Sequence, residues 1–254
     1  MDAFDRVLAE PGSLEARKEL LAAWKRKGDK RASFLEQQLA LFEARQRGDD
    51  TEAMRRAVNL AVIRDGKALA GEVARLVSKF EFHRGLVAEI TISGADFVAR
   101  AAKLFTLAPI QHVTITLPLP LLSAFFDLPQ LAKLTSLNMP KLGGAFGDAG
   151  ASALAGCRHA RALRWIALNN DEITQVGAQA LAASSSLAEV AYLGLRGNPA
   201  DPTPFRQEIM EGQYSSGRPP LADDLEAKFG KRRWLEVPED TDPWPPDRES
   251  LAIA

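Results

Sequence analysis

Residues 190–198 read Val-Ala-Tyr-Leu-Gly-Leu-Arg-Gly-Asn, with apolar side chains at Val190, Leu193 and Leu195 and an asparagine at position 198. Weaker copies of this pattern, each with apolar residues three and five positions after the first, open at Val87, Ile110, Leu134 and Leu163. Successive copies start 23, 24, 29 and 27 residues apart. A short apolar strand pattern that recurs at such a spacing indicates a chain built from stacked, strand-containing units.

The pattern resembles the strand signature of leucine-rich repeats, LxxLxLxxN, whose period is about 20 to 29 residues. Two later units also share a second half, Gly150-Ala-Ser-Ala-Leu-Ala and Gly177-Ala-Gln-Ala-Leu-Ala, at matching places after their strands. This second half is similar to the ribonuclease-inhibitor type of repeat, in which a full helix follows each strand. The resemblance implies an α/β fold with a short solenoid of parallel strands plus helices, about five units long, over residues 85–200.

Residues 1–84 are expected to form an all-helical N-terminal domain, because apolar residues recur at spacings of three and four and helix-forming residues dominate. Helices are predicted over 3–9, from a cap at Ser13 to a cap at Gly28, and over 30–47. A fourth helix is predicted from Thr51, with a break at Asp65-Gly66 before it resumes toward residue 77.

The same N-terminal segment also resembles a known small domain. The helical repeat-companion domain that precedes leucine-rich repeats in some bacterial proteins carries a similar spacing of marker residues, which in this chain are Trp24, Gly28-Asp29, Arg31, Phe34 and Gln38. Lys30 stands where that family usually has proline. The resemblance implies a bacterial protein of this architecture, and it implies no reaction.

Two further segments are expected after Pro199. Residues 201–235 are predicted to form a helical C-terminal cap, with helices over 205–210 and 222–229 joined by a polar loop and with Trp234 over the open edge of the last repeat. Residues 236–254 contain four prolines and six acidic side chains, which is typical of an extended or disordered acidic tail. A further possibility is that this tail folds back onto the basic cluster at Lys25-Arg26-Lys27.

The composition excludes several classes of partner. The 32 basic and 33 acidic residues give a net charge of -1, which argues against a general binder of nucleic acid or of acidic membranes. No apolar run reaches the roughly 18 residues that span a bilayer, and the first residues lack the pattern of a signal peptide, so a cytoplasmic location is expected. The single cysteine, Cys157, excludes an internal disulfide.

No catalytic constellation is visible in the sequence. The run Gly143-Gly-Ala-Phe-Gly147 lacks the lysine of a phosphate-binding loop. The histidines His83, His112 and His159 fall in different units with no paired spacing, so neither a metal nor a cofactor is expected. Cys157 lies near His159, but no signature of a thiol nucleophile surrounds it, and we interpret it as a packing residue. We therefore expect no enzyme, with an unrecognised active site among dispersed Ser, His and Asp residues as the weaker alternative.

Candidate partner-binding residues follow from the alternation of strand side chains. The residues between the required apolar positions should lie on the concave face of the sheet. The residues that we select from this ridge are Arg164, Trp165, Tyr192, Arg196, Asn138, His112, Gln111 and Glu89.

Two rows of this ridge stand apart from the others. Trp165 and Tyr192 occupy equivalent positions on adjacent strands, with arginines beside both, and Trp, Tyr and Arg are enriched at binding hot spots. The alternative is that the two rings pack on each other or under the C-terminal cap. Asp171 and Asn198 occupy the position of the repeat asparagine, where a side chain hydrogen-bonds the backbone of the turn, and we interpret both as structural.

The expected function is that of a non-enzymatic interaction module or adaptor, which binds a protein partner on the concave face of the repeats. The alternative is a regulator of an enzyme, either of the GTPase-activating or of the immunity and inhibitor type, because ribonuclease-inhibitor-like repeats resemble proteins with both roles. The sequence names neither the partner nor the oligomeric state.

Overall fold

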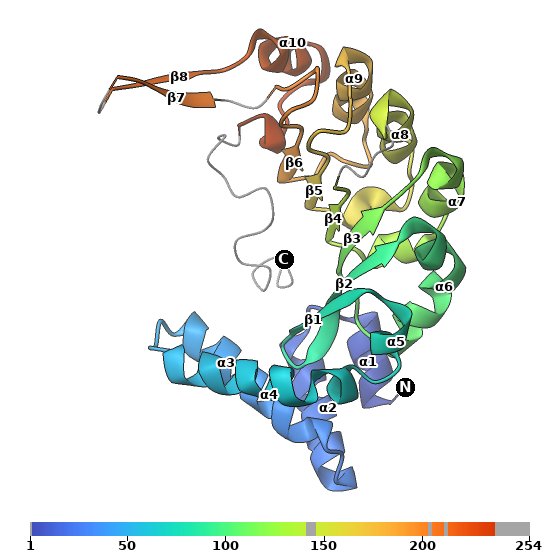
Figure 1. Cartoon of the computed structure of the whole chain (residues 1–254), viewed down its shortest axis with the longest axis vertical. Coiled ribbons are helices and arrows are strands. Elements are labelled where there is room, and N and C mark those ends of the chain that lie inside the picture. The colour runs from blue at the N-terminus through green and yellow to red at the C-terminus, as the bar shows by residue number, and fades with distance from the viewer. Residues whose placement is uncertain (1, 141–145, 203–204, 211–212, 237–254) are drawn as a thin grey trace. The chain divides into compact units, whose positions relative to one another are not determined.

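A computed structural model describes residues 2–140, 146–202, 205–210 and 213–236 of the chain (Figure 1). Within these residues the fold is mixed α/β, with ten α-helices, a six-stranded sheet in the order β1-β2-β3-β4-β5-β6, and a separate two-stranded sheet. The chain divides into two compact units. We call them the N-terminal unit, described residues up to 91 together with 102–111, and the C-terminal unit, residues 92–101 together with the described residues from 112 onward.

Five helices precede the first strand of the N-terminal unit: α1 (Ala3–Ala9), α2 (Leu14–Lys27), α3 (Arg31–Gln46), α4 (Glu52–Ala70) and α5 (Val73–Leu76). The predicted caps of α2 are confirmed, because the Ser13 side chain accepts from Ala16 N and Gly28 ends the helix at φ 66°. Apolar side chains of α1, α2 and α3 form one buried cluster around Leu20, Trp24 and Leu35. This packing explains why short amphipathic helices are stable here.

Two expectations for the N-terminal unit are wrong. Helix α4 runs without a break through Gly66, which is buried; a Cβ on this residue would lie 3.5 Å from Val62 and 4.0 Å from Phe82. Burial in the packed unit offsets the ~1 kcal/mol helix penalty of glycine. Residues expected to be helical also include strand β1 (Lys79–His83), which pairs antiparallel with β2 (Leu86–Ser93). The region before residue 85 is therefore not all helical.

The β1–β2 turn is held against the helices. Arg84 and Gly85 both have positive φ, 51° and 84°, as in the two-residue turns that match strand twist. The Gly85 amide donates to Gln38 Oε1 at 2.6 Å, and an Arg84 guanidinium nitrogen donates to Gly12 O at 2.9 Å. A Cβ on Gly85 would lie 2.6 Å from the Cα of Leu35. The hairpin thus depends on glycine at this position.

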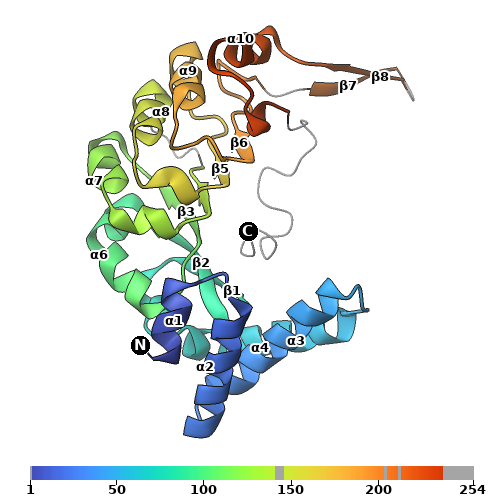
Figure 2. The same ribbon diagram turned by 180° about the vertical axis from the view of Figure 1, so that it is seen from behind.

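The C-terminal unit contains four short parallel strands: β3 (His112–Thr116), β4 (Ser136–Asn138), β5 (Trp165–Ala167) and β6 (Tyr192–Gly194). The helices of this unit are α7 (Leu122–Phe126), α8 (Gly147–Ala155) and α9 (Gln175–Ala183), with single 3₁₀ turns at η1 (Leu119–Leu121), η2 (Pro129–Lys133) and η3 (Ala160–Ala162). Helix α6 (Gly94–Leu107) is divided between the two units at residue 101. Helices α7, α8 and α9 follow one another along one side of the strands (Figure 1 and Figure 2). Strands β3, β4 and β5 are thus each followed by a helical segment on the same side (Figure 1).

The repeated apolar positions form the core of this unit. Val113, Leu137, Ile166 and Leu193 are paired in register on adjacent strands and are at most 5% exposed. The structural interpretation of Asn198 is confirmed. Its Oδ1 accepts from the amides of Asp171 and Ile173 at 2.8 and 3.0 Å, and its Nδ2 donates to the carbonyls of Leu168 and Leu195 at 2.7 and 2.8 Å.

The segment after the last parallel strand differs from expectation in its first half. Residues 205–210, expected to be helical, form β7 (Phe205–Met210), which pairs antiparallel with β8 (Gln213–Gly217) in the region expected to be a polar loop. Six residues close too few helical hydrogen bonds to stabilise an isolated helix, whereas pairing with the next segment satisfies the backbone.

The second half of this segment agrees with the prediction. Helix α10 (Pro220–Phe229) is followed by the 3₁₀ turn η4 (Arg233–Glu236), in which Trp234 is 4% exposed. The turn contacts β6, and Arg232 Nε donates to Ala182 O of α9 at 3.0 Å. The segment therefore packs against strand β6 and helix α9. The acidic tail predicted for 236–254 lies, from residue 237 on, outside the described residues.

Candidate functional site

The four parallel strands align one row of side chains on the face away from α7–α9. His112 pairs with Ser136, Ser136 with Trp165, and Trp165 with Tyr192. The two rings stack, with 4.4 Å between centroids and 14° between planes. The rings therefore pack on each other, which is the alternative to an open binding surface. Tyr192 is only 7% exposed, and Trp165 is half-buried. We call this stacked pair the aromatic platform.

The next row of the sheet shapes the space beside the platform. Ala167 and Gly194 are register partners there. A Cβ on Gly194 would lie 2.7 Å from the Tyr192 hydroxyl oxygen and 2.9 Å from Asn169 Oδ1, so the tyrosine ring leans along its strand over the glycine. Asn169 Oδ1 also accepts from the Arg196 amide at 2.9 Å. Gly194 and Asn169 thus position the platform, and sequence reasoning did not select either.

The arginines selected beside the rings play different roles. A guanidinium nitrogen of Arg164 donates to the carbonyls of Arg161 and Leu163 at 2.9 and 3.0 Å, so this side chain closes the loop before β5. Arg196 is half-buried and follows β6 directly. Among the hydrogen bonds of the described residues, the Arg164 side chain bonds its own loop, whereas the Arg196 side chain does not.

The remaining selected residues do not form an exposed ridge. Glu89, Gln111 and His112 are 6%, 5% and 0% exposed, so their selection as exposed contact residues is wrong. The His112 Nδ1 is at hydrogen-bond distance from Ser136 Oγ, so the imidazole has a polar partner on the neighbouring strand. Asn138 is half-buried and donates weakly to Thr114 Oγ1 at 3.4 Å. Glu89 and Gln111 also belong to the N-terminal unit, whereas the platform belongs to the C-terminal unit.

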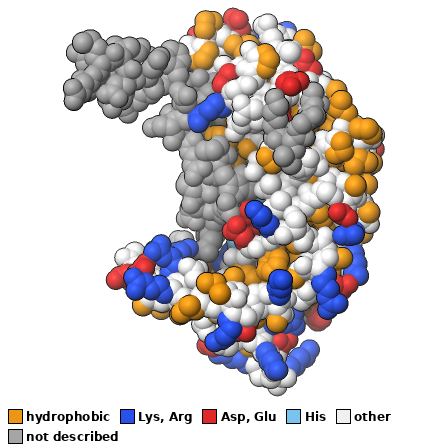
Figure 3. All heavy atoms as spheres, viewed as in Figure 1, with side chains coloured by type: hydrophobic (Ala, Val, Ile, Leu, Met, Phe, Trp, Pro, Cys, Tyr) orange, Lys and Arg blue, Asp and Glu red, His pale blue; other side chains and the backbone are white. Residues whose placement is uncertain are grey.

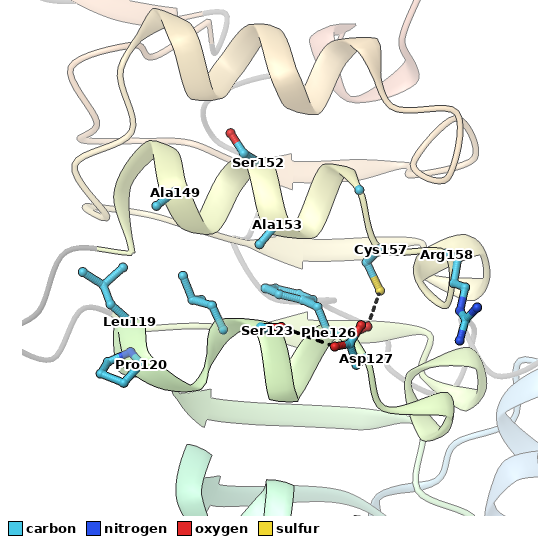
Figure 4. A pocket seen from close by; sticks show the side chains of 12 residues that line it. Leu119, Pro120, Ser123, Phe126, Asp127, Ala149, Ser152, Ala153, Cys157 and Arg158 are labelled. Atoms are coloured by element: carbon cyan, nitrogen blue, oxygen red, sulfur yellow. Dashed lines mark hydrogen bonds between the residues drawn. The ribbon is translucent and has the colours of Figure 1, made fainter.

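A groove of about 720 Å³ lies on the helical side, between α7 and α8 (Figure 4). Its polar groups include Ser123, whose hydroxyl donates to Asp127 Oδ2 at 3.3 Å, and Cys157, whose thiol donates to Phe126 O at 3.2 Å. Burial raises the pKa of the Cys157 thiol, which disfavours the nucleophilic thiolate. The His159 Nε2 accepts from Arg158 Nε at 3.1 Å. The thiol and the imidazole are thus engaged separately, as the packing interpretation of Cys157 expects.

Charged side chains of both signs are interspersed over the surface of the N-terminal unit (Figure 3). Ion pairs such as Lys25 with Glu36 at 2.6 Å and Lys18 with Glu43 at 3.1 Å connect neighbouring helices there. The Lys25 side chain of the predicted basic cluster is therefore partly neutralised. Among the described residues, one group has ligand atoms spaced for a metal ion: Glu81, His83 and Glu89.

Comparison of the chain with protein-family models, with curated proteins and with solved structures gives no match. Within the described part of the chain, no helix combines the length and the apolar character that crossing a membrane requires. Any function must therefore be inferred from the chain's own residues and their arrangement.

Proposed function

We propose that the chain is a short leucine-rich-repeat protein and that it acts as a non-enzymatic interaction module, which binds a protein partner on the concave face of strands β5 and β6. Two observations support the repeat assignment. Buried apolar residues such as Ile166 and Leu193 pair in register on adjacent strands, and Asn198 hydrogen-bonds the turns of two successive units. Unit-to-unit contacts of this kind are how repeat proteins gain stability. The cytoplasmic location stays a prediction of the sequence.

The observation that carries the binding proposal is the aromatic platform. Two stacked rings give a rigid surface whose ordering costs little additional side-chain entropy when a partner binds. The half-buried Trp165 offers the contact edge, and Tyr192 supports it from β6 with its ring over Gly194. Arg196 adds a cation next to the platform, which favours a partner with an apolar anchor flanked by a carboxylate.

The proposal is tested by the affinity of a purified partner for three variants. A partner captured from the native host with the wild-type chain is purified, and its Kd is measured for Trp165→Ala, Arg196→Glu and the control Val176→Ala. Val176 lies on α9 and is 67% exposed, so this control removes apolar surface from the helical side. The loss of Trp165 should weaken binding by about tenfold or more, which corresponds to ~1.4 kcal/mol.

The variants also separate the possible outcomes. Circular dichroism and the Tm of each variant check that the fold is retained. An unchanged Kd for both ridge variants, or an equal loss for Val176→Ala, contradicts the proposal. If the partner is an enzyme, its turnover with and without the chain shows whether binding inhibits or activates it.

A further inference from the structure

The hairpin of the N-terminal unit places three metal-ligating side chains on one face. Glu81 and His83 lie two positions apart on β1, and Glu89 is the register partner of Glu81 on β2. Since strand side chains alternate, Glu81 and His83 point away from Phe82, whose ring packs on Phe34 of α3 with 5.0 Å between centroids. The three side chains therefore lie on the face of the hairpin opposite α3.

A β-bulge lies within this group of three side chains. The register shifts between Glu81 and Phe82, where the partner changes from Glu89 to Val87 and leaves Ala88 without an opposite residue. A bulge bends its strand and changes the direction of nearby side chains. One ligand atom from each of the three side chains lies within 4.8 Å of the other two.

The distance between His83 and Glu89 is close to that between two ligands of one cation. His83 Nε2 and Glu89 Oε2 are 3.6 Å apart, whereas a charge-assisted hydrogen bond is about 2.7 to 2.9 Å long. Bonds from Zn²⁺ to imidazole nitrogen or carboxylate oxygen are about 2.0 to 2.2 Å, which separates two tetrahedral ligands by about 3.4 Å. His83 and Glu89 therefore have nearly the spacing of two zinc ligands, and a ligand atom of Glu81 lies within 4.8 Å of both.

The burial of two of these side chains is a second argument for cation binding. His83 and Glu89 are 5% and 6% exposed, and a buried carboxylate is costly unless it is paired or coordinates a metal. A bound dication attracts the carboxylates of both Glu89 and Glu81. Glu81 is exposed and gives the ion a route from solvent.

We propose that Glu81, His83 and Glu89 form a binding site for Zn²⁺, with one imidazole nitrogen and two carboxylate oxygens as ligands. A mixed nitrogen and oxygen set suits Zn²⁺, whereas Mg²⁺ and Ca²⁺ prefer oxygen ligands alone. Three protein ligands leave one tetrahedral position for water. The bound ion links β1 to β2 beside the Arg84-Gly85 turn. This site is independent of the aromatic platform.

The test uses the full chain without an affinity tag, because a histidine tag binds Zn²⁺ itself. Isothermal titration with Zn²⁺ and with Mg²⁺ measures stoichiometry and Kd for the wild type, Glu81→Gln and His83→Gln. The matched controls are Glu189→Gln, an exposed glutamate elsewhere, and His159→Gln, the histidine beside Cys157. We expect one Zn²⁺ per chain, no comparable Mg²⁺ binding, and a Kd weakened by about tenfold or more in the two cluster variants only.

Thermal unfolding gives an independent readout. Free Zn²⁺ at about 100 times Kd should raise the Tm of the wild type by about 5 °C or more, and much less in Glu81→Gln. Because Glu81 is exposed, its variant keeps the test valid even if His83→Gln does not fold. Sub-stoichiometric Zn²⁺ binding, Zn²⁺ affinity unchanged in Glu81→Gln, or affinity lost in His159→Gln overturns the proposal.

Discussion

The substitution Gly85→Ala tests how the β1–β2 hairpin is held on α3. At φ 84° an alanine costs about 1 to 2 kcal/mol, because its Cβ crowds the following carbonyl. The new Cβ would also lie 2.5 Å from Leu35 Cδ1 and 2.6 Å from Leu35 Cα. The Cα belongs to helix backbone and cannot rotate away, so the turn itself must move.

Movement of the turn removes the buried bond from the Gly85 amide to Gln38 Oε1, which is 2.6 Å long. An unsatisfied buried donor costs about 1 to 3 kcal/mol. Together with the backbone strain, Gly85→Ala should lower the free energy of unfolding by about 2 to 5 kcal/mol, a large share of the 5 to 15 kcal/mol of a typical domain.

The measurement is urea unfolding followed by circular dichroism, with Gly48→Ala as the matched control. Gly48 has a similar φ of 76° but nothing within 4 Å of its Cβ position. The control therefore carries the backbone strain alone and should cost about 1 to 2 kcal/mol. If Gly85→Ala costs no more than Gly48→Ala, the close approach to Leu35 is not what fixes the turn.

Three further substitutions and one chemical probe follow from the C-terminal unit. Asn198→Ala removes four side-chain hydrogen bonds to buried backbone groups, of which the Leu195 carbonyl keeps the bond from the residue 198 amide, and should cost about 3 kcal/mol or more in urea unfolding. An effect below about 1 kcal/mol would show that other contacts hold the turns in place. Burial acts to raise the pKa of Asp148, but hydrogen bonds from Thr174 and Gly177 outweigh it and lower the pKa. Asp148→Ala should therefore cost about 2 kcal/mol at pH 7. The difference from wild type should shrink as the pH falls through the lowered pKa, since the stabilising form is the carboxylate; a difference independent of pH would contradict this. Cys157 should react with a thiol reagent slowly in the native protein and quickly in urea, because it is 4% exposed with a raised pKa; rapid native labelling would contradict its burial. Gly194→Ala should displace the Tyr192 ring and weaken partner binding while the Tm changes little, and an unchanged Kd would count against the platform.

Local signals in the sequence predicted the elements that depend on local structure. The caps at Ser13 and Gly28 satisfy the ends of α2 within the helix itself, and the repeat pattern predicted the buried strand positions and the role of Asn198. The caps lie within a few residues of their partners, and Asn198 bonds the turn one period before it in the repeated pattern. Such contacts recur, so the sequence pattern carries them.

The errors involve contacts that no local pattern encodes. Residues 79–83 form β1 because the Arg84-Gly85 turn returns the chain onto β2 and docks on Gln38. Gly66 stays inside α4 because Phe82 packs beside it. The proposed site at Glu81, His83 and Glu89 is likewise not indicated by the histidine spacing, since the carboxylate of Glu89 approaches His83 only through the pairing of two strands.

In the predicted ridge, the structure confirms that Trp165 and Tyr192 are neighbours, but Tyr192 is buried, as are Glu89, Gln111 and His112 at the N-terminal end. Strand alternation placed Trp165 and Tyr192 next to each other, and register pairing confirms that placement. The alternation of strand side chains does not predict which of the outward side chains are buried by other residues. His112 is an example, because it is fully buried and contacts Ser136. Burial of polar side chains depends on neighbours from other units, which the pattern of one unit does not specify.

The most direct test of the docking proposal is hydrogen exchange of the chain with and without its partner. Docking on the aromatic platform predicts slower exchange in peptides that cover residues 164–167 and 191–196, with unchanged exchange in α8 and α9. Protection of α8 and α9, with no change at β5 and β6, would contradict the proposal that the partner binds on the concave face.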